Sequence, residues 1–402
     1  MQIAATLIFL LTYVGVALGR FPGLRIDRAG IALTGAAMMT AVGAITPEEA
    51  YKAIDLDTIT LLLGMMIVVA HLRLSGFFRL VCQWAIEHAH SQPVLLAVVT
   101  VTSAVSSAFL VNDAVCLVMA PMVIETTRVL KRNPIPYLLA VGLASNIGSA
   151  ATITGNPQNM IIGATLGMPF IEFARYMAPV AAIGTVLALL LLYAASPGEF
   201  FPVERIAGTA ARPRANRWQV TKVLLVTAGV VVLFFAGVPV SEAAILGGAV
   251  LLVTRAIKPM KVYREIDGSL LLMFVGLFVV VAGAEKTLLT PEVVESARHA
   301  GFENAWILTA FTAVLSNLIS NVPAVLAMKP FITSLDDPTR AWLIVSLSST
   351  LAGNLTPVGS VANLIVAERA LREGIRISFW QYARVGGPVT LITLGLSAWW
   401  FA

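Results

Sequence analysis

Charged side chains are scarce in this sequence. Asp, Glu, Lys and Arg make up 12% of its 402 residues, about half the share of a soluble domain, whereas hydrophobic residues make up 58%. From Asn133 to Ile171 the chain contains no acidic, basic or histidine side chain. An uncharged apolar run of that length is typical of membrane-spanning segments. The composition therefore indicates a polytopic membrane protein.

Cysteine and histidine are equally sparse. The chain has two cysteines and four histidines, namely Cys82, Cys116, His71, His88, His90 and His299. The cysteines form no disulfide framework, and no two histidines form a ligand pair inside an apolar span. A membrane-embedded enzyme would need metal ligands or a nucleophile–base pair at membrane depth. The sequence therefore predicts no enzyme, no cofactor and no metal site beyond a Na⁺ ion used for coupling.

The formal net charge of +5 could suit a nucleic-acid partner. In a chain this apolar, the basic excess is instead typical of cytoplasmic loops, where Lys and Arg accumulate. No nucleic-acid partner is predicted, and the expected surroundings are a lipid bilayer.

The stretch Ser145–Gly163 combines an apolar setting with residues that break helices. It reads SNIGSAATITGNPQNMIIG. Gly155, Asn156 and Pro157 do not suit an unbroken helix, because Gly is permissive and Pro lacks a backbone donor. At membrane depth such backbone is tolerated only if it is buried in protein or lines a polar cavity. We therefore predict two half-helices that meet at an unwound loop.

This stretch and a hairpin motif upstream of it both recur later in the chain. Adding 204 to each residue number places Ser145–Gly163 on Ser349–Ala367, which reads STLAGNLTPVGSVANLIVA. Adding 209 places SSAFLVNDAVCLVMAP (106–121) on LSNLISNVPAVLAMKP (315–330). Broken helices in matching positions of two halves point to the binding site of a secondary transporter.

The apolar segments predict an all-α polytopic membrane protein built from two inverted repeats. About ten transmembrane helices and two re-entrant hairpins are expected, with two of the helices broken. The predicted boundaries are 1–199 for the first repeat (hairpin 93–124, broken helix 136–168), 200–217 for a cytoplasmic linker, and 218–402 for the second repeat (hairpin 304–335, broken helix 341–371).

The basic residues orient the chain. Five spans in each half require the halves to have opposite orientations. With both termini outside, all but six of the 27 Lys and Arg residues fall on the cytoplasmic side. The six that remain outside are Lys52, Arg175, Lys286, Arg298, Lys329 and Arg340. This asymmetry follows the positive-inside rule, so we expect a multi-pass protein of the cytoplasmic (inner) membrane with its N- and C-termini outside.

Two broken helices of opposite orientation would bring helix ends to the membrane midplane. Helix N-termini offer free N–H groups and suit an anion, while C-terminal ends and unwound carbonyls suit a cation. Asn and Thr side chains add uncharged donors and acceptors. A small inorganic or organic anion and a coupling cation could then bind side by side without a buried Lys or Arg, and none is expected near either loop.

Asp113 is the one acid at a hairpin tip. A carboxylate at membrane depth costs roughly 2.5–3.5 kcal/mol on insertion scales and is functional by default. It could bind a coupling cation or take up a proton. Because Asp is also a preferred N-cap, the same side chain could cap a helix that starts at Ala114. The matching residue of the second tip is Val322, so the two halves are chemically unequal.

The chain resembles the ion transporter superfamily, which includes divalent anion–sodium symporters, citrate transporters, arsenite-efflux permeases and some sodium/proton antiporters. The similarity covers nearly the whole chain, and its specific parts are FLVNDAVCLVMAP, LISNVPAVLAMKP, TITGNPQN and LTPVGSVAN. The family pattern has Ser-Asn-Thr at each tip, whereas this chain has Val111-Asn112-Asp113 and Ser320-Asn321-Val322. The gained carboxylate is more similar to the arsenite and antiporter branches, which usually carry the acid just before the Asn. The resemblance implies a homodimer with a static scaffold and a transport unit that moves as an elevator.

Candidate site residues are carried over only to the matching tip and loop positions. The candidates for substrate binding are Asn112, Asn156, Asn159, Ser320, Asn321, Thr356, Gly359 and Asn363. The candidates for the coupling ion are Asp113, Asn112, Ser149, Thr152, Gly155, Asn321 and Asn354.

The leading functional hypothesis is an ion-coupled transporter of a small anion, either an oxyanion or a carboxylate. Two alternatives remain open. One is proton-driven efflux of arsenite or antimonite, where hydrogen bonds would matter more than helix ends because arsenite is mostly neutral near pH 7. The other is Na⁺/H⁺ exchange with Asp113 as the shared ligand.

Overall fold

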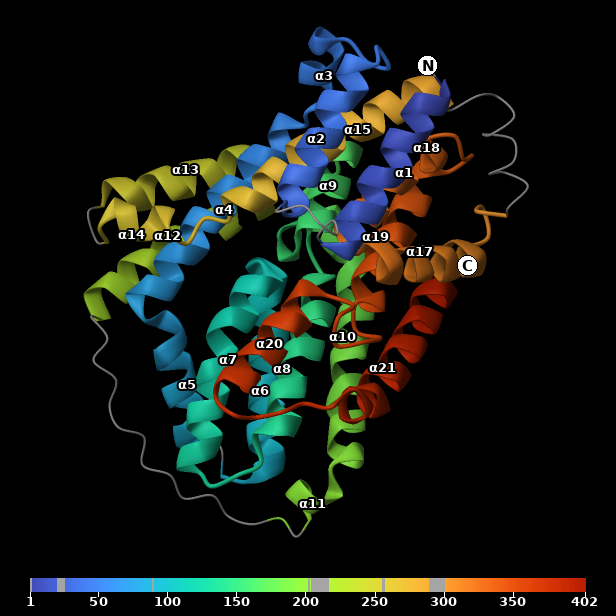
Figure 1. The fold of residues 1–402 in the computed structure, drawn as a ribbon. Coiled ribbons are helices and arrows are strands. Elements are labelled where there is room, and N and C mark those ends of the chain that lie inside the picture. The colour runs from blue at the N-terminus through green and yellow to red at the C-terminus, as the bar shows by residue number, and fades with distance from the viewer. Residues whose placement is uncertain are drawn as a thin grey trace.

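The computed structural model describes residues 2–19, 26–88, 90–201, 203, 217–254, 257–288 and 301–402, and the regular elements within these ranges are all helices (Figure 1). Five of them are long and apolar enough to cross a membrane: Leu56–Ser75, Gln92–Phe109, Phe170–Ala195, Arg217–Phe235 and Gly268–Thr287. Shorter apolar helices accompany them. The predicted all-α polytopic fold is confirmed.

The two halves carry matching series of helices. The first half contains α1 (Gln2–Leu18), α2 (Arg28–Ala41), α3 (Pro47–Ala53), α4 (Leu56–Ser75), α5 (Phe77–His88), α6 (Gln92–Phe109), α7 (Asn112–Val129), α8 (Pro134–Ser149), the 3₁₀ turn η1 (Ile153–Gly155), α9 (Pro157–Leu166), α10 (Phe170–Ala195) and α11 (Pro197–Phe200). The second contains α12 (Arg217–Phe235), α13 (Val240–Val253), α14 (Pro259–Tyr263), α15 (Gly268–Leu288), α17 (Ala305–Ile319), α18 (Asn321–Ile332), α19 (Pro338–Ala352), α20 (Val361–Arg372) and α21 (Phe379–Trp400).

Both hairpins and both broken helices are present. Only Leu110 and Val111 separate α6 from α7, and only Ser320 separates α17 from α18. The first broken helix is α8 followed by η1 and α9, which begins at Pro157. Pro suits the first turn of a helix, because the backbone donor that it lacks would have no partner there. The second broken helix is α19 followed by α20.

Some helices differ from those that the apolar runs of the sequence predict. α5 was not expected, because Arg79 and Glu87 interrupt its apolar residues. The apolar runs predict helices from about Tyr176 and Val385, whereas α10 and α21 begin six residues earlier, at Phe170 and Phe379. The predicted linker 200–217 lies largely outside the described residues, and the boundaries of the two repeats stay a prediction.

The matching halves pack alike where two helix pairs approach most closely. A Cβ added at Gly64 in α4 would lie 2.5 Å from the backbone carbon of Ala244 in α13. One added at Gly276 in α15 would lie 2.5 Å from the backbone carbon of Ala32 in α2. Adding 212 takes Gly64 to Gly276 and Ala32 to Ala244, so α4 on α13 and α2 on α15 are equivalent pairs. Small residues at such crossings let backbones approach in a membrane protein.

Substituting either crossing glycine should therefore destabilise the protein. We expect Gly64→Ala and Gly276→Ala each to cost about 1–3 kcal/mol, because the added carbon would force the paired backbones apart. Gly229→Ala in α12 is the control, since nothing lies within 4 Å of its added Cβ, and it should be neutral or slightly stabilising. Melting of detergent-purified variants tests this, and equal midpoints for the three would contradict it.

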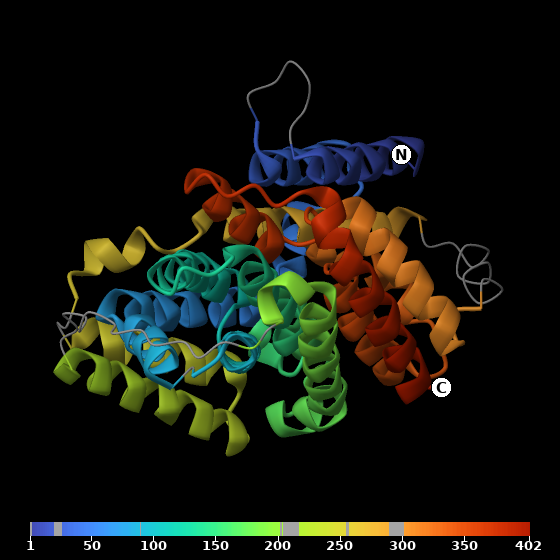
Figure 2. The same cartoon turned by 90° about the horizontal axis from the view of Figure 1, so that it is seen from below.

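The last helices of the two halves also pair. α10 lies beside α21 in both views (Figures 1 and 2), and a Cβ added at Gly184 would lie 3.1 Å from the Thr393 side chain. This pair, together with α8 and α19, surrounds a buried polar centre in which Ser145, Asn146 and Ser349 are fully buried. Both halves therefore contribute to one shared core.

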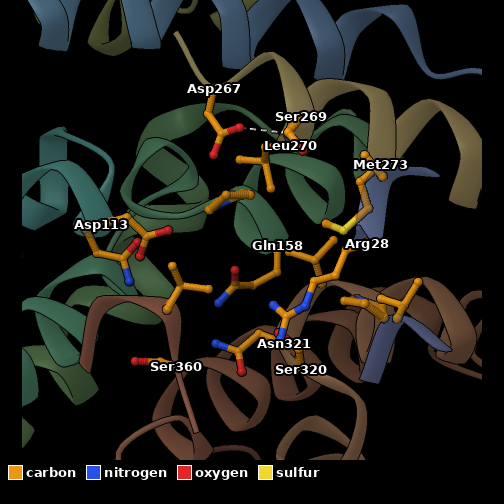
Figure 3. A pocket seen from close by; sticks show the side chains of 17 residues that line it. Arg28, Asp113, Gln158, Asp267, Ser269, Leu270, Met273, Ser320, Asn321 and Ser360 are labelled. Atoms are coloured by element: carbon orange, nitrogen blue, oxygen red, sulfur yellow. Dashed lines mark hydrogen bonds between the residues drawn. The ribbon is translucent and has the colours of Figure 1, made fainter. Parts of the chain in front are cut away.

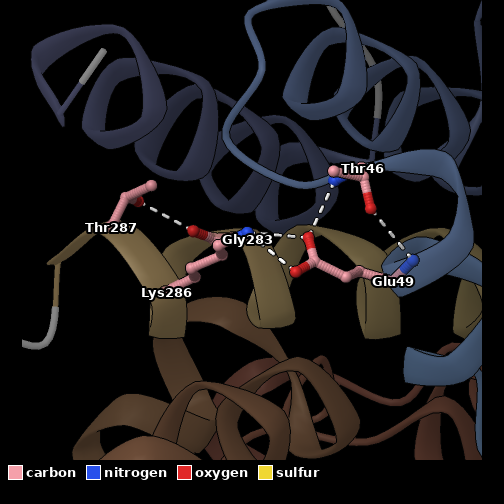
Figure 4. Close-up of polar contacts among 5 residues, drawn as sticks. All are labelled: Thr46, Glu49, Gly283, Lys286 and Thr287. Atoms are coloured by element: carbon pink, nitrogen blue, oxygen red, sulfur yellow. Dashed lines mark hydrogen bonds and ion pairs between the residues drawn. The ribbon is translucent and has the colours of Figure 1, made fainter.

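An ion pair outside the apolar core holds α3 against α15 (Figure 4). Thr46 and Glu49 form a capping box at the start of α3. The Lys286 Nζ donates to both carboxylate oxygens of Glu49 at 2.8 Å. These donors, chiefly Lys286, lower the pKa of Glu49 to about 2. Glu49 therefore stays ionised, and the contact between the two helices keeps its charge, throughout the physiological pH range.

Candidate functional site

A cavity of about 240 Å³ lies where the two hairpin tips meet (Figure 3). The first tip contributes Asn112 and Asp113, and the second contributes residues 320–323. The first residues of α9, α20, α2 and α15 and the end of α1 complete its wall. These other lining residues are Val16, Arg28, Ala29, Pro157, Gln158, Asp267, Ser269, Leu270, Met273, Ser360 and Val361.

Six helix N-termini therefore meet at this cavity, and the four that belong to the hairpins and broken helices differ in how their first N–H groups are satisfied. The Asn156 Oδ1 accepts from the backbone N of Asn159 at the start of α9, and the Ser360 Oγ accepts from that of Asn363 at the start of α20. The N-caps of α7 and α18 are Val111 and Ser320, and neither makes a side-chain capping bond. Pro323 has no N–H and the Ala114 N–H donates to the Val111 carbonyl, so the groups available to a ligand are the N–H groups of the first two residues of each helix.

Ser320 adopts an unusual backbone conformation at the second tip. Its φ is +76° and its ψ is 157°. A residue with a Cβ rarely adopts this region, and such strain clusters at functional sites. The conformation turns the chain within one residue, so that α18 starts directly at the cavity.

Four candidate residues from the sequence line the cavity together: Asn112, Asp113, Ser320 and Asn321. Asp113 does not act as the helix cap considered above. α7 begins at Asn112, one residue earlier than that interpretation requires, and its cap is Val111. Asp113 therefore occupies the first turn of α7, with its carboxylate on the cavity wall (Figure 3).

The asparagines of the first loop do not line the cavity but bind the loop's own backbone. The Asn156 Nδ2 donates to the Ser149 carbonyl at 3.2 Å and to the Thr350 hydroxyl at 3.3 Å. The Asn159 Nδ2 donates to the Thr152 carbonyl at 2.9 Å. These bonds satisfy carbonyls that the unwound segment leaves without helical partners. Direct binding of substrate by Asn156 or Asn159 stays a prediction.

Other candidates of the first half are also packed inside the protein. The Ser149 hydroxyl donates to the Asn146 carbonyl at 2.8 Å, and that of Thr152 donates to the Ala108 carbonyl. A Cβ at Gly155 would lie 2.1 Å from the Ser149 carbonyl oxygen, so this position has no room for a side chain. These three residues lie behind the cavity wall.

The asparagine side chains of the second loop also donate to backbone carbonyls inside the protein. The Asn363 Nδ2 donates to the Gly353 carbonyl at 2.9 Å and to the Tyr382 hydroxyl at 2.6 Å. The Asn354 Nδ2 donates to the Leu143 carbonyl at 3.1 Å. Thr356 is half-buried and Gly359 is buried, and neither lines the cavity. Their roles as ligands likewise stay predictions.

One buried chain of amides joins the first tip to the second broken helix. The Asn112 Nδ2 donates to the Asn146 Oδ1 at 2.9 Å. The Asn146 Nδ2 in turn donates to the Asn354 Oδ1 at 2.9 Å and to the Ser360 hydroxyl at 2.7 Å. Asn146 was not among the candidates, although it belongs to the central motif. It connects two cavity-lining residues, Asn112 and Ser360, from opposite halves.

The expectation that no Lys or Arg lies near either loop is wrong, because Arg28 lines the same cavity as Gln158 and Ser360. Asp267 and Ser269 from α15 and its preceding turn line it as well. No motif in the sequence marked these residues. α2 and α15 reach the tips only through long-range packing, and from the sequence alone the basic residues before α2 indicate only the orientation of the chain.

The described residues contain no cluster of three or more His, Cys, Asp or Glu side chains that could hold a metal ion. The Asp113 carboxylate and the neutral tip amides offer oxygen donors of the kind that suit a hard cation. Binding of Na⁺ here stays a prediction.

Comparison with known proteins places the chain in a family. A family model described as "Citrate transporter" matches residues 13–343. The chain belongs to this family. The resemblance inferred from the tips and loops is thereby confirmed, and the protein is an integral, multi-pass membrane transporter.

Relatives of this citrate transporter family member carry several names. An uncharacterized transporter of Mycobacterium tuberculosis is 31% identical over 99% of this chain and 97% of its own length. The silicon efflux transporter LSI3 of Oryza sativa subsp. japonica is 30% identical over 93% and 92%. The putative transporter arsB of Dictyostelium discoideum is 25% identical over 92% and 86%.

A solved structure shares the fold. The YdaH transporter of Alcanivorax borkumensis, whose crystal structure was described as having an unusual topology, superposes with a TM-score of 0.62. The alignment covers 99% of this chain and 95% of that one at 16% identity. At this identity the similarity concerns architecture alone.

Proposed function

We propose that this protein is a secondary active transporter that moves a small oxyanion or carboxylate across the cytoplasmic membrane, coupled to Na⁺ or H⁺. The observation that carries the proposal is the meeting of two uncapped helix N-termini, from α7 and α18, at one cavity. Backbone N–H groups at helix starts favour a negatively charged ligand. The tip amides of Asn112 and Asn321 add neutral hydrogen-bonding groups.

The size of the cavity favours a molecule over a bare cation. About 240 Å³ is several times the roughly 30 Å³ that one water occupies in the liquid. This supports transport of a polyatomic substrate over simple Na⁺/H⁺ exchange. Asp113 then serves the coupling ion, either by binding Na⁺ or by carrying a proton.

A second candidate is the efflux of a small neutral acid such as arsenite. It is favoured by the mixture of a carboxylate and neutral amides on the same wall, and by relatives named for silicon efflux and arsB. Hydroxyl groups of such an acid could donate to Asp113 and accept from the tip N–H groups.

Transport by purified protein in liposomes distinguishes these functions. The panel is citrate, phosphate, arsenite and silicic acid, each tested with an imposed Na⁺ gradient and with an imposed proton gradient. Uphill movement of citrate or phosphate supports the proposal. Movement of arsenite or silicic acid alone supports the second candidate, and cation exchange without any of the four supports the antiporter.

We further propose a homodimer in which α1, α2, α4, α12, α13 and α15 form a scaffold and the hairpins and broken helices move as an elevator. The proposal is supported by the close α2–α15 and α4–α13 crossings, which join the scaffold helices to one another.

The orientation proposed for this transporter places both termini and Glu48 outside and Lys261 in the cytoplasm. Arg214 and Glu292 lie outside the described residues, and they are expected in the cytoplasm and outside, respectively. Single-cysteine variants treated with a membrane-impermeant reagent test this, because only the positions outside should react in intact cells. Labelling of position 214 from outside would contradict the inverted-repeat topology.

A further inference from the structure

Arg28 brings a positive charge to the hairpin tips from a helix outside the hairpins. It is the first residue of α2, it is half-buried, and it lines the cavity. Its guanidinium points toward Asn321 and Ser320 of the second tip (Figure 3). A Cβ at Gly19, whose φ is +73°, would lie 3.3 Å from the Arg28 Nε, so the turn after α1 supports one side of this side chain.

The position of this charge is unfavourable for the helix that carries it. A helix N-terminus carries partial positive charge, so a cation in the first turn is repelled by it. Among the described residues the neighbouring Asp27 carboxylate forms no ion pair with Arg28, and it accepts instead from Gly30 N at 2.9 Å and from the Ser269 hydroxyl at 3.1 Å. Within the described part of the chain, Arg28 has no hydrogen bond or ion pair. Its charge is therefore directed at the cavity.

The other acid at this end of the cavity is also engaged locally. The Asp267 Oδ1 accepts from the backbone N of Leu270 at 2.9 Å and so caps α15. Asp113 lies on the first tip, whereas Arg28 points at the second (Figure 3). A ligand held between the tips would meet the guanidinium at one end and the Asp113 carboxylate at the other.

The second half of the chain offers no equivalent charge. Adding 212 takes Arg28, the first residue of α2, to Val240, the first residue of α13. The same shift takes Leu56, the start of α4, to Gly268, the start of α15, and it takes the α4 cap Asp55 to Asp267. Because helix starts, caps and crossing glycines all agree on this shift, the absence of a basic residue at Val240 is a real difference between equivalent positions.

We propose that Arg28 binds an ionised oxygen of the substrate, and that it does so only while the tips face the starts of α2 and α15, as they do here. This inference rests on the proposed transport of an anion. In a transporter of inverted repeats, alternating access moves one part of each repeat against the other around the bound substrate. In the opposite arrangement the tips face the starts of α13 and α4, where Val240 provides no charge. The protein therefore binds an ionised substrate more tightly from the face at which α2 and α15 begin.

The test measures KM separately at the two faces of liposomes containing oriented protein. The variants are Arg28→Gln, which removes the charge, and Arg28→Lys, which keeps it without the guanidinium geometry. Arg376→Gln is the control, because Arg376 is exposed on the side predicted to be cytoplasmic and lies away from the cavity. Citrate and phosphate are the ionised probes, and arsenite is the neutral probe.

Arg28→Gln should raise the KM for the ionised probe about tenfold or more at the face where α2 and α15 begin, as expected for loss of a charge-assisted hydrogen bond. The KM at the opposite face should change less than about twofold, and Arg28→Lys should be intermediate. Any arsenite transport should be unaffected, and Arg376→Gln should match the parent.

Three results would overturn the role of Arg28: an unchanged KM for the ionised probe, an equal change at both faces, or an equal change for arsenite. If the parent protein moves neither citrate nor phosphate under either gradient, the proposed anion transport fails together with this inference. If the parent moves an anion and Arg28→Gln moves it with the same KM, only the role of Arg28 fails.

Discussion

Asp113→Asn should abolish concentrative transport while leaving exchange of substrate at equal concentrations intact. The carboxylate lines the cavity beside Asn112 and is the only acid at either tip. Asparagine keeps its size and removes the charge that a coupling cation or proton requires. The fold should survive, because Asp113 is not the N-cap of α7, a position that Val111 occupies, and the lost favourable charge in the first turn is worth only about 0.3–1 kcal/mol.

Measuring substrate accumulation in liposomes under an imposed gradient tests this expectation. The matched control is Asp267→Asn, which removes the same charge from the same cavity. The capping contact with Leu270 should persist there, since Asn also caps helices, and accumulation should be retained. Proton coupling predicts that Asp113→Asn loses the pH dependence of transport, and Na⁺ coupling predicts a shifted Na⁺ requirement. If Asp113→Asn accumulates substrate like the parent at every pH and Na⁺ concentration tried, coupling lies elsewhere.

The tips and broken helices could be predicted from the sequence because their signals are local. Pro157 and Gly155 interrupt an apolar run that a membrane helix would otherwise occupy, and the same interruption recurs near Gly359. Within a bilayer such an interruption is tolerated only in protein or beside a cavity, so composition alone limits where it can lie. The structure has both breaks at these places.

The remainder of the cavity wall could not be predicted, because it depends on contacts between distant segments. Arg28 and Asp267 reach the tips through the α2–α15 crossing, where Gly276 lets two backbones approach. A glycine in a membrane helix is too common to mark such a crossing by itself. Only the spatial pairing shows that the 212-residue shift relates two equivalent contacts.

The polar loop residues were marked by their motif, but their roles could not be predicted from the sequence. A sequence cannot separate an amide that binds substrate from one that satisfies the protein's own unwound backbone, since both are Asn or Thr in the same motif. In the structure Asn156 and Asn159 serve carbonyls within their own loop. The residues next to them, Pro157 and Gln158, line the cavity instead.

The largest loss of stability is expected from Asn146→Ala. Truncation would leave the Asn112 Nδ2 and the Asn354 Oδ1 without the partners described above, whereas the Ser360 hydroxyl would keep its bond from the backbone N of Asn363. Each buried polar group left unpaired costs about 1–3 kcal/mol, so the two groups together predict a loss of about 2 kcal/mol or more. Because Asn112 and Ser360 both line the cavity, substrate affinity should fall with stability. The two properties are expected to change together, since one side chain holds the first tip against the second broken helix.

Ser145→Ala is the matched control for this substitution. Ser145 is the adjacent residue and is also fully buried, but among the described residues its hydroxyl has a hydrogen bond only with the Cys116 thiol, at 2.9 Å. Unfolding of detergent-purified protein should therefore show a much smaller loss for Ser145→Ala than for Asn146→Ala, and citrate or arsenite transport should be nearly unchanged. Equal losses for the two variants would mean that the amide chain adds nothing beyond ordinary packing. The first tip would then be held in place by the apolar contacts of α7 rather than by Asn146.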